Sequence, residues 1–126
     1  MTHSSLSLKS LFLGAVLALP GLAFAAEPAM TQNGVLVDHR GMTLYTFAKD
    51  EQGKSKCNDE CAKNWPPLKA ESTDKGEGQW TTLIRDDQQM QWAYNGKPLY
   101  TFVMDKQAGD KTGDGKMDGA WKVAKP

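Results

Sequence analysis

The four-residue sequence Leu-Tyr-Thr-Phe occurs twice in this chain, at residues 44–47 and at residues 99–102. The two copies are 55 residues apart (99 − 44), and a glycine lies three residues before each leucine. An aspartate follows three residues after each phenylalanine, as Asp50 and Asp105. Self-similarity at a fixed period is the signature of a repeated supersecondary unit. The chain is therefore predicted to contain two related units, at about residues 34–68 and 79–126.

Both units are predicted to consist mainly of β-hairpins. Short runs rich in β-branched and aromatic residues, separated by turn residues, are typical of strands. Six strands are predicted, at residues 35–39, 42–47, 79–85, 90–94, 97–103 and 120–124. Residues 55–64 suit a short helix with Asn58 or Ser55 as its N-terminal cap, and residues 26–33 are expected to be a flexible lead. The predicted fold is a single all-β domain over residues 34–126, mainly of antiparallel hairpins, with about six strands and one short helix.

The register of the hairpins decides which side chains share a face, because a slip of one residue turns every side chain over. A three-residue loop ending in a left-handed glycine, at residues 39–41 and 94–96, places the aromatic residues of each copy on one face. Those faces are Val35, Val37, Tyr45 and Phe47 in the first copy and Met90, Trp92, Tyr100 and Phe102 in the second. We therefore predict a bulged three-residue loop in both copies, and pairing of Trp92 with Leu99 would refute it.

The N-terminus has the features of a secretory signal peptide. Residues 1–25 contain one Lys or Arg, Lys9, followed by an apolar run at 11–19 and by Ala23-Phe-Ala25, a small-x-small cleavage site. Pro20 and Gly21 interrupt the apolar run before it reaches the roughly 20 residues that span a bilayer. Cleavage is expected to leave a soluble periplasmic or secreted protein with no stable membrane anchor.

The charge balance of the mature chain excludes one class of partner. Without Lys9, 14 of the 15 basic residues remain against 15 acidic ones, so the formal charge is about −1. Binding to nucleic acid depends on clustered Lys and Arg, and no such cluster is present. No nucleic-acid partner is expected.

The chain has two cysteines, Cys57 and Cys61. Their spacing does not match Cys-x-x-Cys-His haem attachment or a Cys-x-x-Cys redox pair, and structural zinc requires four ligands. In an oxidising compartment we expect a disulfide between them. Because it closes only a short loop, it is expected to stabilise the fold by about 2 kcal/mol.

The repeated motif offers two interpretations. Aromatic residues two apart lie on one face of a strand, where they form either a stacking platform for a sugar, peptide or flat cofactor, or part of the core. The aspartates either contribute to binding or cap the turn that follows each strand. The candidate binding residues are Tyr45, Phe47, Asp50, Tyr100, Phe102 and Asp105.

The sequence contains two weaker candidate metal sites. The segment at 110–121 partly follows the order of a calcium loop, with Asp110, Thr112, Asp114 and Asp118 at ligand positions, but Trp121 stands where the bidentate glutamate is required. Met42, Met90, Met104 and His39 could bind a soft metal, although methionine more often fills gaps in a core. We expect no metal and no cofactor.

The motif Tyr-x-Phe-x-x-Asp in both copies, with Cys57-x3-Cys61, Trp65-Pro-Pro-Leu and the closing Gly-Asp-rich segment before Trp121, resembles the bacterial secreted-repeat family described by a Yx(FWY)xxD motif. Many members of that family resemble lipoproteins, whereas this chain lacks a cysteine after its signal. The resemblance implies an exported protein and leaves the molecular function unknown.

With a single mature histidine and no phosphate-binding glycine loop, the sequence gives no basis for catalysis. We expect a non-catalytic module that binds or stabilises an envelope component: a protein, glycan or small ligand. The alternative is a protein that binds a metal ion or small cofactor.

Overall fold

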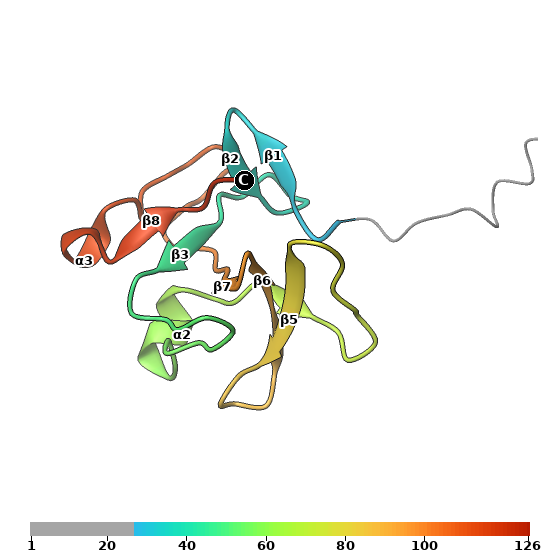
Figure 1. Ribbon diagram of the computed structural model, residues 1–126. Helices are drawn as coiled ribbons and strands as arrows, with labels where there is room; N and C mark the ends of the chain where they lie inside the picture. Colours follow the sequence, from blue (N-terminus) through green and yellow to red (C-terminus); the bar gives the residue numbers. More distant parts are fainter. Residues whose placement is uncertain (1–26) are drawn as a thin grey trace, which may run out of the picture.

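The computed structural model describes residues 27–126 (Figure 1). In this range the chain forms small antiparallel sheets and two helices of about one turn. The strands are β1 (Met30–Gln32), β2 (Val35–Val37), β3 (Tyr45–Phe47), β4 (Lys69–Ala70), β5 (Trp80–Ile84), β6 (Met90–Tyr94), β7 (Lys97–Pro98) and β8 (Trp121–Val123), and the helices are α2 (Glu60–Asn64) and α3 (Lys116–Gly119). The predicted all-β class is confirmed, with eight strands in place of about six. The predicted signal peptide lies outside the described residues.

The ordered domain begins earlier than predicted. Strand β1 pairs with β2 through a two-residue Asn33-Gly34 turn, in which both residues have positive φ. Ala29 is also buried in the core. The prediction of a flexible lead over residues 26–33 is therefore wrong from Ala29 onward. Asn-Gly is a strong hairpin signal, but the short polar strand before it has no apolar alternation.

The two motif hairpins have different loops. In the first copy Val37 pairs with Thr43, and the amide of Gly41, at φ 85°, donates to the Asp38 carbonyl. The predicted three-residue loop at 39–41 is therefore confirmed.

In the second copy the prediction is wrong. Tyr94 pairs with Lys97 across a two-residue Asn95-Gly96 turn, and the amide of Leu99 donates to the Trp92 carbonyl at 3.0 Å. Asn95 and Gly96 have φ of 51° and 80°, as the hairpin turns that match strand twist require.

The observed register of the second hairpin divides its aromatic residues between two clusters. The predicted register placed them on one face. The hairpin core contains Ala29, Leu36, Leu44, Ala70, Trp80, Trp92, Leu99 and Ala124. The aromatic core contains Tyr45, Phe47, Cys57, Trp65, Tyr100, Phe102 and Trp121. Both faces of the motif strands are covered, so aromatic residues on either face are buried.

The chain divides into two halves, here called the first repeat (29–70) and the second repeat (80–125), whose motif strands meet at the centre. The amide of Tyr45 donates to the carbonyl of Tyr100 at 2.8 Å, and the amide of Tyr100 donates to the carbonyl of Tyr45 at 3.0 Å. The two repeats are thus related by an approximate two-fold axis at this pair.

The end of each repeat pairs with the motif of the other. Residues 66–68, just before β4, pair with residues 99–101, and β8 pairs with β3. The amide of Leu68 donates to the Leu99 carbonyl at 2.9 Å, and that of Ala124 donates to the Leu44 carbonyl at 2.8 Å. In Figure 1, β8, near the C-terminus, accordingly lies beside β3. The repeats have exchanged their last segments within one chain.

The predicted helix at 55–64 is shorter than expected. Helix α2 begins only at Glu60, after Asp59 at φ 54°, and no side chain caps its N-terminus. Ser55 is buried and forms other hydrogen bonds, so neither predicted cap is used. Within residues 27–126, no helix has the length and apolar character needed to cross a membrane.

Candidate functional site

Each motif tyrosine forms a hydrogen bond to an aspartate of the other repeat. The Tyr45 hydroxyl donates to Asp105 Oδ2 at 2.7 Å, and the Tyr100 hydroxyl donates to Asp50 Oδ2 at 2.6 Å. Both tyrosines are fully buried. The tyrosine of each motif therefore pairs with the aspartate of the other copy.

The second oxygen of each aspartate binds the loop of its own repeat. Asp50 Oδ1 accepts from the Lys56 amide at 2.7 Å, and Asp105 Oδ1 accepts from the Thr112 amide at 2.9 Å. An aspartate that accepts from backbone amides a few residues ahead fixes a turn. Each carboxylate thus joins its own loop to the tyrosine of the other repeat.

Four aromatic rings stack in a column that alternates between the repeats. Phe47 stacks on Trp121 at 4.2 Å between ring centroids, Trp121 stacks on Trp65 at 3.8 Å, and Trp65 stacks on Phe102 at 4.1 Å. Sequence reasoning did not assign the two tryptophans to the motif. A signal was available, because they follow their phenylalanines by 18 and 19 residues (65 − 47 and 121 − 102).

These eight residues are here called the latch: Tyr45, Phe47, Asp50, Trp65, Tyr100, Phe102, Asp105 and Trp121. None of the six rings is more than 8% exposed. The rings therefore lie in the core and offer no free stacking face to a ligand, and the two aspartates cap loops.

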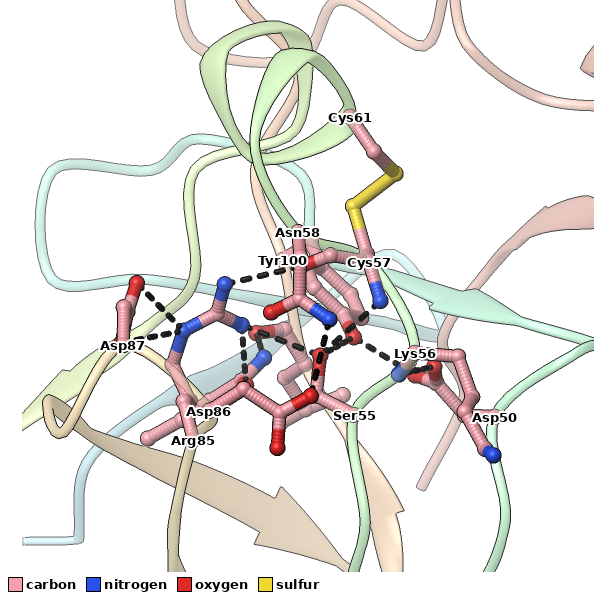
Figure 2. The surroundings of a disulfide bond; sticks show 12 residues. Asp50, Ser55, Lys56, Cys57, Asn58, Cys61, Arg85, Asp86, Asp87 and Tyr100 are labelled. Atoms are coloured by element: carbon pink, nitrogen blue, oxygen red, sulfur yellow. Dashed lines mark hydrogen bonds and ion pairs between the residues drawn. A yellow bond between two sulfur atoms is a disulfide. The ribbon is translucent and has the colours of Figure 1, made fainter.

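A buried arginine that sequence reasoning missed supports the latch (Figure 2). The Arg85 side chain is 0% exposed. Its Nη1 donates to Ser55 Oγ at 3.0 Å and to Gln91 Oε1 at 2.9 Å, and its Nη2 donates to the Cys57 carbonyl at 2.8 Å. Its Nε faces the Asp87 carboxylate at 3.3 Å. The guanidinium connects the second repeat to the segment that holds the disulfide.

Ser55 joins this arginine to the latch. Its hydroxyl oxygen accepts from Arg85 and lies 2.7 Å from the Tyr100 hydroxyl oxygen. Because Tyr100 gives its own proton to Asp50, Ser55 donates to Tyr100. The predicted disulfide between Cys57 and Cys61 is present beside this network, with Cα atoms 5.2 Å apart.

Burial changes the ionisation of the latch. It raises the pKa of Tyr45, and the hydrogen bond to Asp105 raises it further. Burial likewise raises the pKa of Tyr100, with a further contribution from its hydrogen bond to Asp50. The pKa of Asp50 is also raised by burial, although the hydrogen bonds from Tyr100 and the Lys56 amide oppose this.

Stability is expected to fall at alkaline pH. A tyrosine in the unfolded chain ionises near pKa 10, whereas Tyr45 and Tyr100 keep their protons in the fold. Their contribution is complete below about pH 10 and is lost as the pH rises toward the folded-state pKa, by up to about 1.4 kcal/mol per pH unit for each tyrosine. Urea unfolding measured at successive pH values tests this. Tyr45→Phe should make the free energy of unfolding fall less steeply with pH above about pH 10, by the contribution of one tyrosine. An unchanged slope would contradict the claim that Tyr45 keeps its proton in the fold.

Three of the four candidate calcium residues form hydrogen bonds within the protein. Asp110 Oδ2 accepts from the amides of Lys106 and Gln107, and Asp114 Oδ1 accepts from the Val123 amide. The Thr112 hydroxyl donates to Asp105, and Asp118 lies in α3 with φ 55°. Across residues 27–126, no three His, Cys, Asp or Glu side chains gather in a group that could hold a metal ion.

The candidate soft-metal residues have separate surroundings. Met90 packs against the hairpin core, whereas Met104 is 57% exposed. His39 Nε2 contacts the carbonyl of Glu27 at 2.7 Å, and Met42 is half-buried.

A groove lies between the repeats. It consists of two adjoining hollows of about 600 Å³ and about 390 Å³, whose walls share Thr46, Asn95, Lys97, Gly119 and Lys122. Lys125 and the half-buried Tyr94 also line the larger hollow. The groove therefore combines residues of β3 and β8 with the turn of the second hairpin.

A family model described as a secreted repeat of unknown function matches the chain twice, at residues 29–69 and at residues 81–125. These ranges agree closely with the two halves that exchange their last segments, and together they cover more than half of the chain. Neither the curated proteins nor the solved structures give a significant match. The predicted resemblance is thus confirmed: the chain is an exported protein that belongs to this family of secreted repeats.

Proposed function

We propose that the chain is a non-catalytic module of the bacterial cell envelope, periplasmic or secreted, which binds an acidic glycan in the groove between its repeats. The latch acts as the scaffold that shapes this groove. The observation that carries the proposal is the charge of the groove walls.

Three exposed lysines line the groove: Lys97, Lys122 and Lys125. None of them forms an ion pair with another described residue. Acidic side chains also line the walls, Asp114 in the larger hollow and Asp50 and Glu51 in the smaller one. All three have partners within the protein: Asp114 accepts from the Val123 amide, Asp50 accepts from the Tyr100 hydroxyl and the Lys56 amide, and Glu51 pairs with Lys56. The larger hollow therefore has three lysines against one acidic side chain, Asp114. An excess of charge of one sign raises the local concentration of ligands of the other sign.

The remaining walls suit a sugar. Thr46 and Asn95 offer hydroxyl and amide groups, and the half-buried Tyr94 ring lies at the side of the larger hollow. Polar side chains with an aromatic ring are the groups that orient a polar ligand in a pocket. Tyr45, Tyr100 and Asp105 of the motif are buried in the latch. Asp50 is half-buried and lines the smaller hollow, where hydrogen bonds from Tyr100 and the Lys56 amide hold its carboxylate. These internal hydrogen bonds support a non-catalytic role.

Calorimetric titration of the mature protein with oligogalacturonate, a carboxylate-bearing glycan, tests the proposal. Binding should weaken with added salt, and Lys97→Gln with Lys122→Gln should weaken it by roughly three- to tenfold, because each exposed charge contact contributes up to about 1 kcal/mol. Lys106→Gln with Lys111→Gln removes equal charge outside the groove and should leave binding unchanged.

Equal losses in the two double variants, or equal binding of neutral dextran, would contradict the groove assignment. Native mass spectrometry before and after chelation distinguishes the alternative function. A stoichiometric metal ion or cofactor that remains bound would favour the metal- or cofactor-binding protein and argue against the present proposal.

A further inference from the structure

We propose that the interface between the repeats can also form between two copies of this chain, in a dimer in which the first repeat of each packs on the second repeat of the other, and that the segment connecting the repeats decides between this dimer and the closed single chain. This inference is independent of the glycan site. It follows from how the two cores are composed.

Neither repeat has a core of its own. The hairpin core takes Ala29, Leu36, Leu44 and Ala70 from the first repeat and Trp80, Trp92, Leu99 and Ala124 from the second. The aromatic core is divided in the same way, with four buried residues from the first repeat and three from the second. A separate repeat would expose these residues to water. Each repeat therefore needs the other to bury its core residues.

The contacts between repeats are also reciprocal. Each tyrosine–aspartate pair and each phenylalanine–tryptophan stack joins one repeat to the other. The end of each repeat, residues 66–68 or β8, also pairs with the motif of the other. A second chain presents the same groups in the same geometry. An exchanged dimer therefore keeps every contact between repeats and changes only the connecting segment, which is the condition for domain swapping.

The connecting segment, residues 71–79, makes a crossover. It leaves β4 where Ala70 pairs with Met90, and it enters β5 where Trp80 pairs with Tyr94. Both strands are antiparallel to β6 and lie on its two sides. The segment must therefore return four residues along the strand, about 13 Å, and pass two strand spacings, about 10 Å.

This crossover is short, because connections between parallel strands usually need a dozen or more residues. The direct distance is roughly 16 Å, obtained from these two components. Deleting residues 73–78 leaves three residues, and their four Cα–Cα steps reach about 14 Å when fully extended. The shortened chain cannot close on itself, but it can close on a second copy.

The first test is the molar mass of this shortened full-length chain, measured by light scattering after size-exclusion chromatography. The expected result is twice the monomer mass with a native near-ultraviolet circular dichroism spectrum. A chain with six glycine and serine residues inserted after Lys75 is the matched control and should remain monomeric. A folded monomer of the shortened chain would overturn the proposal.

A second test covers the case in which the shortened chain does not fold. Full-length Trp65→Ala and Trp121→Ala chains are unfolded and refolded separately and together. Only a mixed dimer regains one intact core, with Trp65 from one chain and Trp121 from the other. Native mass spectrometry should show at least a tenfold rise in dimer in the mixture over either chain alone. If the mixture gives no mixed dimer, the proposal is wrong.

Discussion

Trp121→Ala should lower the free energy of unfolding by about 3–5 kcal/mol, the cost of truncating a large buried aromatic side chain. Trp121 is 0% exposed. Its ring stacks between Phe47 and Trp65, and the Tyr100 ring packs against it at an interplanar angle of 87°. Its removal therefore opens the centre of the aromatic core. Because a domain of this size has only about 5–15 kcal/mol of stability, the loss should be large in urea unfolding followed by circular dichroism.

Trp121→Phe provides the matched control. It keeps an aromatic ring in the column, and it removes an indole N–H that has no hydrogen-bond partner among the described residues. An unpaired buried polar group is itself costly, so Trp121→Phe should cost clearly less than Trp121→Ala. Equal losses in the two variants would mean that the stack contributes little, and an unchanged Trp121→Ala variant would contradict the packing described.

Arg85→Met should lower the free energy of unfolding by about 2–6 kcal/mol. The substitution keeps an unbranched apolar stem but leaves two buried acceptors without the guanidinium, the Gln91 side-chain oxygen and the Cys57 carbonyl. Each orphaned buried acceptor costs about 1–3 kcal/mol. Asp87 adds little to the loss, because its side chain is 44% exposed. Urea unfolding of the oxidised protein measures the effect.

Arg85→Lys separates geometry from charge. Lysine keeps the positive charge, but its single ammonium group cannot reproduce the planar fork that reaches acceptors on several sides. The variant should therefore remain destabilised by at least half of the loss seen in Arg85→Met. If lysine restored full stability, the charge alone would be important and the hydrogen-bond assignment would be wrong.

Much of the fold could be predicted from local patterns. The strand positions, the all-β class, the disulfide and the loop at 39–41 all depend on residues close together in the chain. The prediction for the loop at 94–96 is wrong because it assumes a single apolar face for each hairpin. The Asn95-Gly96 turn signal was the stronger one, and the aromatic residues could lie on both faces because the fold has two cores.

The partners of the motif residues could not be predicted. Asp50 and Asp105 occupy the same position in two similar sequences, so the sequence alone gives no reason for Tyr45 to bind Asp105, 60 residues away, in place of Asp50. Only the exchange of final segments, a property of the whole fold, determines this choice. Arg85 was open to inference, since Leu83 and Arg85 alternate on the buried side of the chain while Ile84 is 67% exposed.

The central claim is that each motif acts on the other repeat, and a pair of double-mutant cycles in urea unfolding tests it most directly. Tyr45→Phe combined with Asp105→Ala, the pair that shares a hydrogen bond at 2.7 Å, should show a coupling energy of about 1–3 kcal/mol. Tyr45→Phe combined with Asp50→Ala pairs the same tyrosine with the aspartate of its own motif, and its coupling should stay within about 0.5 kcal/mol. Strong coupling of Tyr45 to Asp50 with none to Asp105 would contradict the account.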